Sequence, residues 1–334
     1  MNKMDLVDRK LLNIIQSGFP LVDEPYKEIG DQLGISEDEL LRRLAAMRKS
    51  NVVRQISAIF DTRRLGYKTT LVAMAYPPAD LHKSALKINE HPGVSHNYAR
   101  EGSFYNLWFT LAVASDESLE DTINDMARRT QAQSHRLMPT IRFFKIGVNF
   151  DMVERKSAAF DYSPDGFNKP VSKDWNKPVT LSDFDIQAIR ELQEDLSMVS
   201  RPFDGMAQRL GLSNQDLYAM ATEFQERGIM RRYSAVLHHR KAGFKSNAMA
   251  VWEVPEERAE EVGKIMAAHT GVTHCYQRPT FPDWPYTHFT MIHATSKGGC
   301  EEAISEISRA TNLDDYLILY SSREYKKTRV RYFV

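Results

Sequence analysis

The spacing of apolar residues along the chain follows two patterns, one typical of helices and one typical of strands. Near the N-terminus the apolar positions lie as on one face of a helix, at Leu6, Leu11, Leu12 and Ile15. A second short helix is predicted over 26–33, and Ser36 with Glu39 three residues later forms a capping box that opens a third helix ending near residue 50. A β-rich segment follows at 53–60, so this region predicts a winged helix-turn-helix.

From residue 66 onward the alternating pattern of strands predominates. We predict strands and helices in the order βαββαβ, which is the ferredoxin-like pattern. The predicted strands lie at 68–75, 94–99, 105–114 and 141–150, and the predicted helices lie at 79–89 and 119–129.

The chain carries this succession twice. The tetrapeptide at 33–36, Leu-Gly-Ile-Ser, is matched by Leu-Gly-Leu-Ser at 210–213, a shift of 177 residues. After small insertions the matches continue: 91–100 overlays 269–278, Phe109-Thr110 overlays Phe289-Thr290, and Lys145 meets Lys326. Self-similarity of this kind marks a repeated structural unit.

We therefore predict an α+β fold of two tandem copies related by a pseudo-two-fold axis. The first copy spans 1–150 (helix-turn-helix 1–60, βαββαβ unit 66–150), a linker spans 151–178, and the second copy spans 179–334 (helix-turn-helix 179–238, βαββαβ unit 243–334). A winged helix followed by such a unit resembles the Lrp/AsnC family of small-molecule-responsive regulators. The resemblance implies an internal pseudo-dimer with paired sheets, and a further homo-oligomer is compatible with it.

Composition and charge narrow the functional classes. Lys plus Arg and Asp plus Glu both number 44, giving a formal net charge of zero, whereas DNA-binding proteins usually carry a basic excess. With 42% hydrophobic residues the chain is not disordered throughout, and no apolar stretch approaches the roughly 20 residues of a membrane span. Two cysteines, Cys275 and Cys300, are too few for a disulfide framework. We expect a cytoplasmic protein with no membrane partner.

The predicted recognition helices are poorly suited to DNA. The first opens Ser-Glu-Asp-Glu at 36–39 and its copy opens Ser-Asn-Gln-Asp at 213–216, where a regulator would read bases. A basic stretch follows in the first copy, at Arg42, Arg43, Arg48 and Lys49, and is typical of a solvated helix face. We infer a fold shared with regulators but without their DNA-reading residues, while an Lrp/AsnC-type DNA-binding regulator that senses a small molecule remains the alternative function.

The same three residue types recur at alternate positions of one predicted strand in each copy. They are His96, Tyr98 and Arg100 in the first copy and His274, Tyr276 and Arg278 in the second. Residues two apart on a strand share a face, so a titratable ring, a phenol and a fixed cation are expected side by side. Such a set is costly to bury without a ligand, although a hydrogen-bonded structural histidine is the ordinary alternative. For the aromatic residues on the next strand, the alternative to a ligand-binding role is packing in an ordinary apolar core.

Four motifs together resemble the siroheme decarboxylases in their fused, two-copy form. They are Val-Ser-His-Asn-Tyr at 94–98 with Tyr-Asn-Leu-Trp-Phe-Thr at 105–110, His-Cys-Tyr-Gln-Arg-Pro at 274–279, Trp-Pro-Tyr at 284–286, and Arg-Arg-Tyr-Ser-Ala-Val-Leu-His-His-Arg-Lys-Ala-Gly-Phe at 231–244. The resemblance covers nearly the whole chain outside the linker. It implies removal of CO2 from the C12 and C18 acetate side chains of siroheme, giving 12,18-didecarboxysiroheme in haem d1 or alternative haem biosynthesis, with no added cofactor.

The residue chemistry suits a flat tetrapyrrole that carries many carboxylates. Carboxylates favour fixed cations, and the ring favours aromatic walls. We expect carboxylate contacts from Arg231, Arg232, Arg278 and Arg100, a further substrate contact from His238, and walls from Tyr276, Tyr98, Trp284, Tyr286 and Trp108. Loss of CO2 leaves carbanion character that needs a proton, for which histidine is suited at neutral pH. The predicted donors are His274 and His239 in the second copy and His96 in the first, with ligation of the siroheme iron as the alternative role of a histidine.

The copies differ where the wing ends. The second copy reads His238-His239-Arg240, whereas the first reads Asp61-Thr62-Arg63 and so lacks these histidines. We expect Asp61 to repel carboxylates and the second copy to complete the working pocket. The chain shows no glycine-rich nucleotide loop, and the spacing of His269 and His274 is better explained by a turn than by a metal site.

Overall fold

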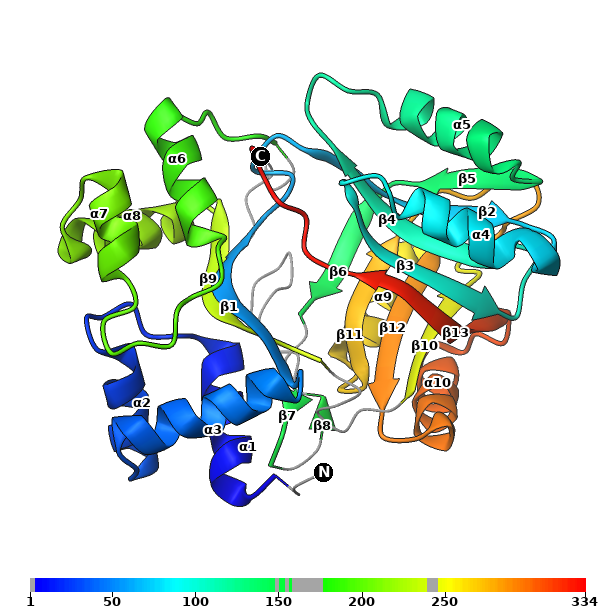
Figure 1. The fold of residues 1–334 in the computed structure, drawn as a ribbon. Helices are drawn as coiled ribbons and strands as arrows, with labels where there is room; N and C mark the ends of the chain where they lie inside the picture. The colour runs from blue at the N-terminus through cyan, green and yellow to red at the C-terminus, as the bar shows by residue number, and fades with distance from the viewer. Residues whose placement is uncertain (1–3, 148–149, 154–155, 158–176, 239–245) are drawn as a thin grey trace.

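The computed structural model describes residues 4–147, 150–153, 156–157, 177–238 and 246–334. The chain forms two lobes, one of short helices and one built around a large sheet, and the C-terminal segment returns from the sheet to the helical lobe (Figure 1). Both lobes contain elements from both copies. No helix of the described residues is long and apolar enough to cross a membrane.

The helical lobe contains both helix-turn-helix units and both wings. Its helices are α1 (Leu6–Ser17), α2 (Pro25–Leu33), α3 (Glu37–Lys49), α6 (Asp183–Leu192), α7 (Asp204–Leu210) and α8 (Asn214–Glu226). The Leu-Gly turn recurs in both copies for the same reason. Gly34 and Gly211 both end a helix in the left-handed region, with φ of 70° and 69°, which glycine adopts readily. Ser36 caps α3 as predicted, but the capping box is incomplete because the Glu39 carboxylate binds Arg42 and Arg43 instead.

The two wings pair with each other rather than folding back on their own copies. Strand β1 (Val53–Phe60) runs antiparallel to β9 (Met230–Leu237), and Ser57 lies opposite Ser234, its match in the repeat. The pseudo-two-fold axis therefore passes between these two serines.

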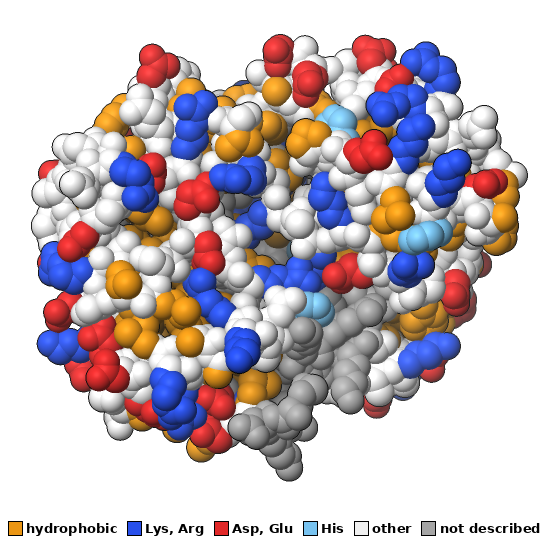
Figure 2. All heavy atoms as spheres, viewed as in Figure 1, with side chains coloured by type: hydrophobic (Ala, Val, Ile, Leu, Met, Phe, Trp, Pro, Cys, Tyr) orange, Lys and Arg blue, Asp and Glu red, His pale blue; other side chains and the backbone are white. Residues whose placement is uncertain are grey.

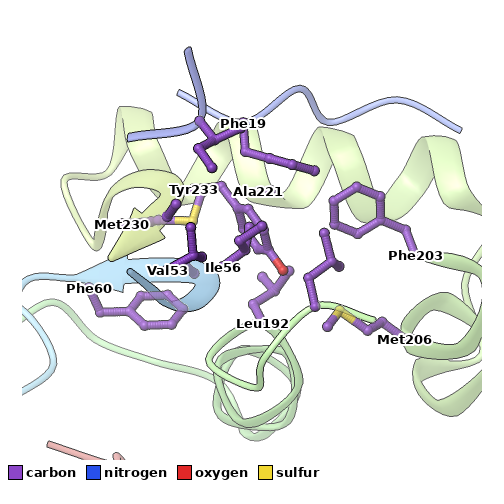
Figure 3. Packing of buried hydrophobic residues seen from close by; sticks show 14 of the residues in the cluster. Phe19, Val53, Ile56, Phe60, Leu192, Phe203, Met206, Ala221, Met230 and Tyr233 are labelled. Atoms are coloured by element: carbon purple, nitrogen blue, oxygen red, sulfur yellow. The ribbon is translucent and has the colours of Figure 1, made fainter. Parts of the chain in front are cut away.

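One apolar core fills the helical lobe. Figure 3 shows side chains of the first copy in contact with those of the second, among them Phe19, Val53, Ile56 and Phe60 from the first and Leu192, Phe203, Met206, Ala221, Met230 and Tyr233 from the second. Neither helix-turn-helix unit has a separate core, so the two copies fold as one body.

The sheet lobe holds nine strands in one sheet, in the order β5-β2-β4-β3-β13-β10-β12-β11-β6. They are β2 (Lys68–Ala75), β3 (Val94–Glu101), β4 (Leu107–Val113), β5 (Ser134–Met138), β6 (Arg142–Ile146), β10 (Ser246–Trp252), β11 (Val272–Gln277), β12 (His288–Ala294) and β13 (Tyr316–Lys327). Helices α4 (Pro78–Ile88) and α5 (Leu119–Thr130) pack on the first copy's strands. The second copy has η1 (Glu256–Arg258), α9 (Ala259–Ala268) and α10 (Lys297–Thr311), of which α9 and α10 pack on its strands. The short strands β7 (Phe150–Asp151) and β8 (Lys156–Ser157) form a separate ribbon.

Each copy ends in a strand that pairs with the other copy. Strand β6 of the first copy lies beside β11, and the C-terminal half of β13 lies beside β3. The predicted shared interface between the sheets is thereby confirmed. The predicted strand over 141–150 is corrected: β5 is the first copy's own fourth strand, and β6 crosses to the other copy. Strand β5 was missed because it lies at an edge, and four of its five residues are partly exposed, so it lacks an alternating pattern.

The sheet curls so that its two halves face each other. Its edge strands β5 and β6 are separated by residues 139–141 alone, which brings the edges together. The space between the halves is filled by a core that includes Ala73, Trp108, Met249, Trp284 and Leu319. We call the side that faces this space the inner face.

The strand register also corrects part of the repeat alignment. Val94 pairs with Leu111 while Val272 pairs with Ile292, and Tyr98 pairs with Trp108 while Tyr276 pairs with Phe289. Phe289 therefore matches Trp108, not Phe109, because a slip of one residue would turn every side chain of the strand to the other face. The predicted match of Lys145 with Lys326 holds, since they pair with the equivalent residues Cys275 and Asn97.

Candidate active site

The His-Tyr-Arg set lies on the inner face in both copies, as the alternation predicted. The rings of His96 and Tyr98 stack with centroids 6.5 Å apart, and those of His274 and Tyr276 stack at 6.0 Å. The guanidinium of Arg100 lies 5.5 Å from the Tyr98 ring centre, and that of Arg278 lies 4.8 Å from the Tyr276 ring centre. We call each set a ladder, with arginine at one end and histidine at the other.

The arginine ends of the ladders join the two copies. Arg100 Nη1 donates to the carbonyl of Leu319 at 3.1 Å, and Arg278 Nη1 donates to the carbonyl of Met138. Both guanidiniums are nearly buried, and burial lowers the pKa of each to about 10. The structure thus places Arg100 and Arg278 inside the curled sheet rather than at a rim where carboxylates would enter.

The tryptophans predicted as walls are part of the inner core. Trp108 and Trp284 are fully buried with ring centroids 5.4 Å apart, and Tyr286 packs against Trp284 at 5.1 Å. The two tryptophans therefore fit the alternative role given for these aromatic residues, packing in an ordinary apolar core, and they hold the sheet halves together.

The histidine ends of both ladders lie near each other beside the wings, where Arg231, His96 and Lys327 all influence the charge of His274. We call this place the mouth and define it by His96, His274, Lys327 and Arg231. Figure 2 shows Lys and Arg side chains gathered where the surface is hollowed between the lobes, with histidine beside them. Burial, and then the charges of Arg231, His96, Lys327 and Lys145, lowers the pKa of His274 to about 3. Burial and Lys327 lower the pKa of His96 to about 4, so both rings are neutral at neutral pH.

The wing cations at the mouth are held in place by first-copy residues. Arg231 Nη2 lies 2.8 Å from Asp61 Oδ2, and Arg63 Nε lies 3.7 Å from Asp61 Oδ1. Burial alone would raise the pKa of Asp61, but Arg231 and Arg63 outweigh it and keep that pKa below its ordinary value. The charge of Asp61 is thus offset by the two arginines that it holds, and its expected repulsion of substrate carboxylates stays a prediction.

The other predicted wing residues are placed less fully. Arg232 Nε donates to Ser234 Oγ at 3.1 Å, and the His238 amide donates to the Val52 carbonyl at 2.8 Å. His239 lies outside the described residues. The turn explanation for His269 is confirmed, since its Nδ1 accepts from the Gly271 amide at 3.0 Å. No group of three or more potential metal ligands occurs among the residues that the structure describes.

One histidine at the mouth was missed in the sequence. His293 follows Phe289 and Met291 at alternate positions of β12 and so shares the inner face with them. Its Nδ1 lies 3.1 Å from Thr273 Oγ1, which also lies 3.1 Å from His274 Nδ1. The alternation was visible in the sequence, but the contact with Thr273 depends on strand pairing.

Comparison with known families accounts for both kinds of domain. A model described as AsnC-like ligand binding domain matches residues 64–145 and 241–326, and one described as siroheme decarboxylase NirDL-like HTH domain matches 8–54 and 185–231. The siroheme decarboxylase of Hydrogenobacter thermophilus is 39% identical over 97% of this chain and 94% of its own length. The chain belongs to the siroheme decarboxylase family.

Other family members match either the whole chain or half of it. The siroheme decarboxylase NirDL subunit of Paracoccus pantotrophus is 32% identical over 97% of this chain and 96% of its own length. The siroheme decarboxylase beta subunit of Methanosarcina barkeri is 44% identical over 44% of this chain and 97% of its own length. The fused chain thus corresponds to enzymes built from two subunits.

Solved structures of the family share the arrangement of the whole chain. The crystal structure of the siroheme decarboxylase NirDL matches with a TM-score of 0.71 and 35% identity over 98% of this chain and 94% of that one. A co-complex of NirDL with an iron-uroporphyrin III analogue matches with a TM-score of 0.70 and 34% identity, over 98% of this chain and 95% of that one.

Proposed function

We propose that this siroheme decarboxylase removes CO2 from the C12 and C18 acetate side chains of siroheme at the mouth, giving 12,18-didecarboxysiroheme. The observation that carries the proposal is the gathering of two neutral histidines, His96 and His274, with cations from two separate strands. These cations are Arg231 on β9 and Lys327 on β13. Cations beside neutral imidazole rings favour an anionic ligand, and the related NirDL binds an iron-uroporphyrin III analogue.

The reaction needs a proton donor beside the acetate. When the bond between the methylene and the carboxylate breaks, CO2 leaves and the electron pair stays on the methylene carbon, where the macrocycle delocalises it. A proton added there completes the methyl group, and His274 is the donor that we propose. In the free protein its low pKa leaves it neutral, and substrate carboxylates at the mouth would raise that pKa and supply the charged form.

We place the reaction at the second-copy ladder. The apolar residues Phe143 and Ile146 of β6 lie opposite Tyr276 and His274. The guanidinium of Arg63 lies 5.6 Å from the Phe143 ring centre. An apolar wall beside a cationic rim suits a flat ring with anionic substituents. His239, which lies outside the described residues, remains a proposed second donor.

No added cofactor is required by the stoichiometry. The acetate group and one proton give a methyl group and CO2, with no electrons left over for an acceptor. The iron belongs to the substrate. We propose that siroheme alone suffices, with activity retained after dialysis against a chelator.

DNA is not a proposed partner. Arg43 of α3 binds Asp5, Asp8 and Glu39, Arg42 binds Glu39, and Arg48 binds both Asp195 oxygens at 2.6 and 2.8 Å. These ion pairs occupy cations that would otherwise contact phosphates. We expect duplex DNA binding no tighter than the non-specific range of about 10⁻⁴ M, and we propose a cytoplasmic enzyme.

The deciding experiment is incubation of the purified chain with siroheme, followed by mass spectrometry of the tetrapyrrole. We expect stepwise loss of two CO2 and a spectral change on binding. An unchanged siroheme mass, together with sub-micromolar sequence-specific binding of labelled DNA at physiological salt, would support the regulator instead.

A further inference from the structure

The hydroxyl of Thr273 joins two histidines of the second copy. Thr273 is the extra residue of a β-bulge in β11, between the pairs Val272 with Ile292 and His274 with Met291. Its Oγ1 lies 3.1 Å from the Met291 carbonyl, 3.1 Å from His293 Nδ1 and 3.1 Å from His274 Nδ1. Bulges commonly redirect side chains next to active sites.

The hydrogen count of this contact gives an assignment for both rings. A hydroxyl carries one hydrogen and two lone pairs. The Met291 carbonyl can only accept, whereas each imidazole Nδ1 can donate or accept according to its tautomer. With the hydroxyl hydrogen on the carbonyl, both Nδ1 atoms carry a hydrogen, and the lone pair of each neutral ring lies on Nε2.

We infer that His293 is a positioning residue, which acts through the Thr273 hydroxyl to hold His274 in the Nδ1–H tautomer with its Nε2 ready to exchange a proton with the substrate. Without His293, one lone pair of the hydroxyl is vacant and the hydroxyl can turn to donate to His274 Nδ1. That ring would then carry its hydrogen on Nε2. The inference about turnover rests on the proposed function, whereas the tautomer itself does not.

The first copy lacks this arrangement. There the bulge residue is Ser95, whose Oγ lies 3.1 Å from His96 Nδ1 and 2.7 Å from Thr110 Oγ1. Either hydroxyl can donate to the other, so the tautomer of His96 is not determined. The corrected repeat places Ala112 at the position of His293, so only the second-copy ladder has a second histidine.

The direct test is nitrogen NMR of the full chain labelled with ¹⁵N-histidine, in which the His274 signals are assigned by their loss in His274→Asn. We expect the Nδ1–H tautomer in the unaltered chain. His293→Ala, which introduces the first-copy residue, should shift His274 toward Nε2–H. His293→Asn keeps an N–H donor near the Nδ1 position and should restore the original tautomer. Thr273→Val and Thr273→Ser form an independent pair, of which only the first removes the hydroxyl.

Turnover of siroheme provides the second measurement. Loss of the partner that orients a metal-bound histidine typically costs about 10–100-fold in activity, and we expect a fall of the same order for the partner that orients His274. We expect that fall in kcat for His293→Ala and Thr273→Val, with KM little changed and near-full activity in His293→Asn and Thr273→Ser. An unchanged His274 tautomer in both His293→Ala and Thr273→Val would overturn the inference. A shifted tautomer in a chain that never decarboxylates siroheme would instead refute the proposed function and leave the tautomer assignment intact.

Discussion

The two ladders have the same geometry, but different residues face them across the strand. In the first copy His96 pairs with Lys327 and Tyr98 with Glu324, whereas in the second copy His274 pairs with Ile146 and Tyr276 with Phe143. Glu324 accepts from the Tyr98 hydroxyl at 3.3 Å and lies 3.6 Å from Arg54. The first ladder thus has its own anion beside it, while the second has an apolar wall and no such carboxylate at the equivalent position.

The exchange of end strands allows the residues that face the two ladders to differ while the His-Tyr-Arg set of each ladder stays the same. Each copy supplies the strand that faces the other copy's ladder, so changes in β6 affect the second ladder and changes in β13 affect the first. The contacts that hold the exchange are the same on both sides. Lys326 Nζ donates to the His91 carbonyl at 3.3 Å, and Lys145 Nζ donates to the equivalent His269 carbonyl at 3.3 Å. The two ladders of the fused chain thus share a symmetric scaffold and differ in what faces them, which is the basis for our proposal that the second ladder carries the reaction.

The largest expected effect comes from removing the histidine of the second ladder. His274→Ala should lower kcat by about 10²–10⁴-fold, the usual contribution of a general acid, with siroheme binding largely retained. His239→Ala should act in the same direction. The matched His96→Ala should cost less, because Glu324 and Lys327 face that ladder. Steady-state rates with absorbance titration of siroheme distinguish these outcomes, and full loss in His96→Ala with an active His274→Ala, His239→Ala chain would place the chemistry in the first copy.

The second effect concerns the buried carboxylate that orients the wing cations. Removing one partner of a buried ion pair costs about 3–5 kcal/mol, so Asp61→Asn should lower the free energy of unfolding by that amount at neutral pH. The Asp61 pKa lies below its ordinary 3.8, so the stabilisation is present above that pH and is lost as the pH falls through the lower folded value. Denaturant titrations of both chains should converge in acid.

Asp125→Asn is the matched control, since Asp125 pairs with Arg128 on the exposed surface of α5. Its effect should be within about 0.5 kcal/mol. Equal losses in the two variants would show that Asp61 does not organise Arg231 and Arg63.

These residues also show which parts of the structure can be predicted from the sequence. The helices, the strands that alternate, the repeat and the shared face of each ladder all follow from local spacing, which the sequence states directly. The contact of Asp61 with Arg231 joins residues 170 positions apart and depends on the pairing of the wings. The exchange of β6 and the contact of His293 with Thr273 likewise depend on strand register, which no local pattern determines.

A third, smaller effect is proton uptake when siroheme binds. Around His274 lie Arg231, His96, Lys327, Lys145 and His293, and the ring is neutral when the site is free. Substrate carboxylates would raise the pKa of the histidines, so affinity should increase as the pH falls, by at most about tenfold per pH unit for each proton taken up.

Calorimetry in two buffers of different ionisation enthalpy measures this uptake. We expect a net gain of protons near neutral pH that decreases in His274→Ala. Proton release, or the same uptake in both chains, would contradict the proposal that bound carboxylates raise the pKa of His274.

The smallest effect is expected from making the first ladder more like the second. Glu324→Gln removes the carboxylate that faces Tyr98 and Arg54, both side chains of the ion pair being about one-fifth exposed. Such a pair contributes at most about 1 kcal/mol, so stability should change little. Because the charge of Arg54 would then be available to an anion at the mouth, siroheme affinity should rise by a factor of about two to five, with kcat unchanged. Glu302→Gln on the exposed surface of α10 is the control and should alter neither quantity. A large fall in kcat for Glu324→Gln would mean that the first ladder takes part in the reaction, and the division of work between the copies would have to be abandoned.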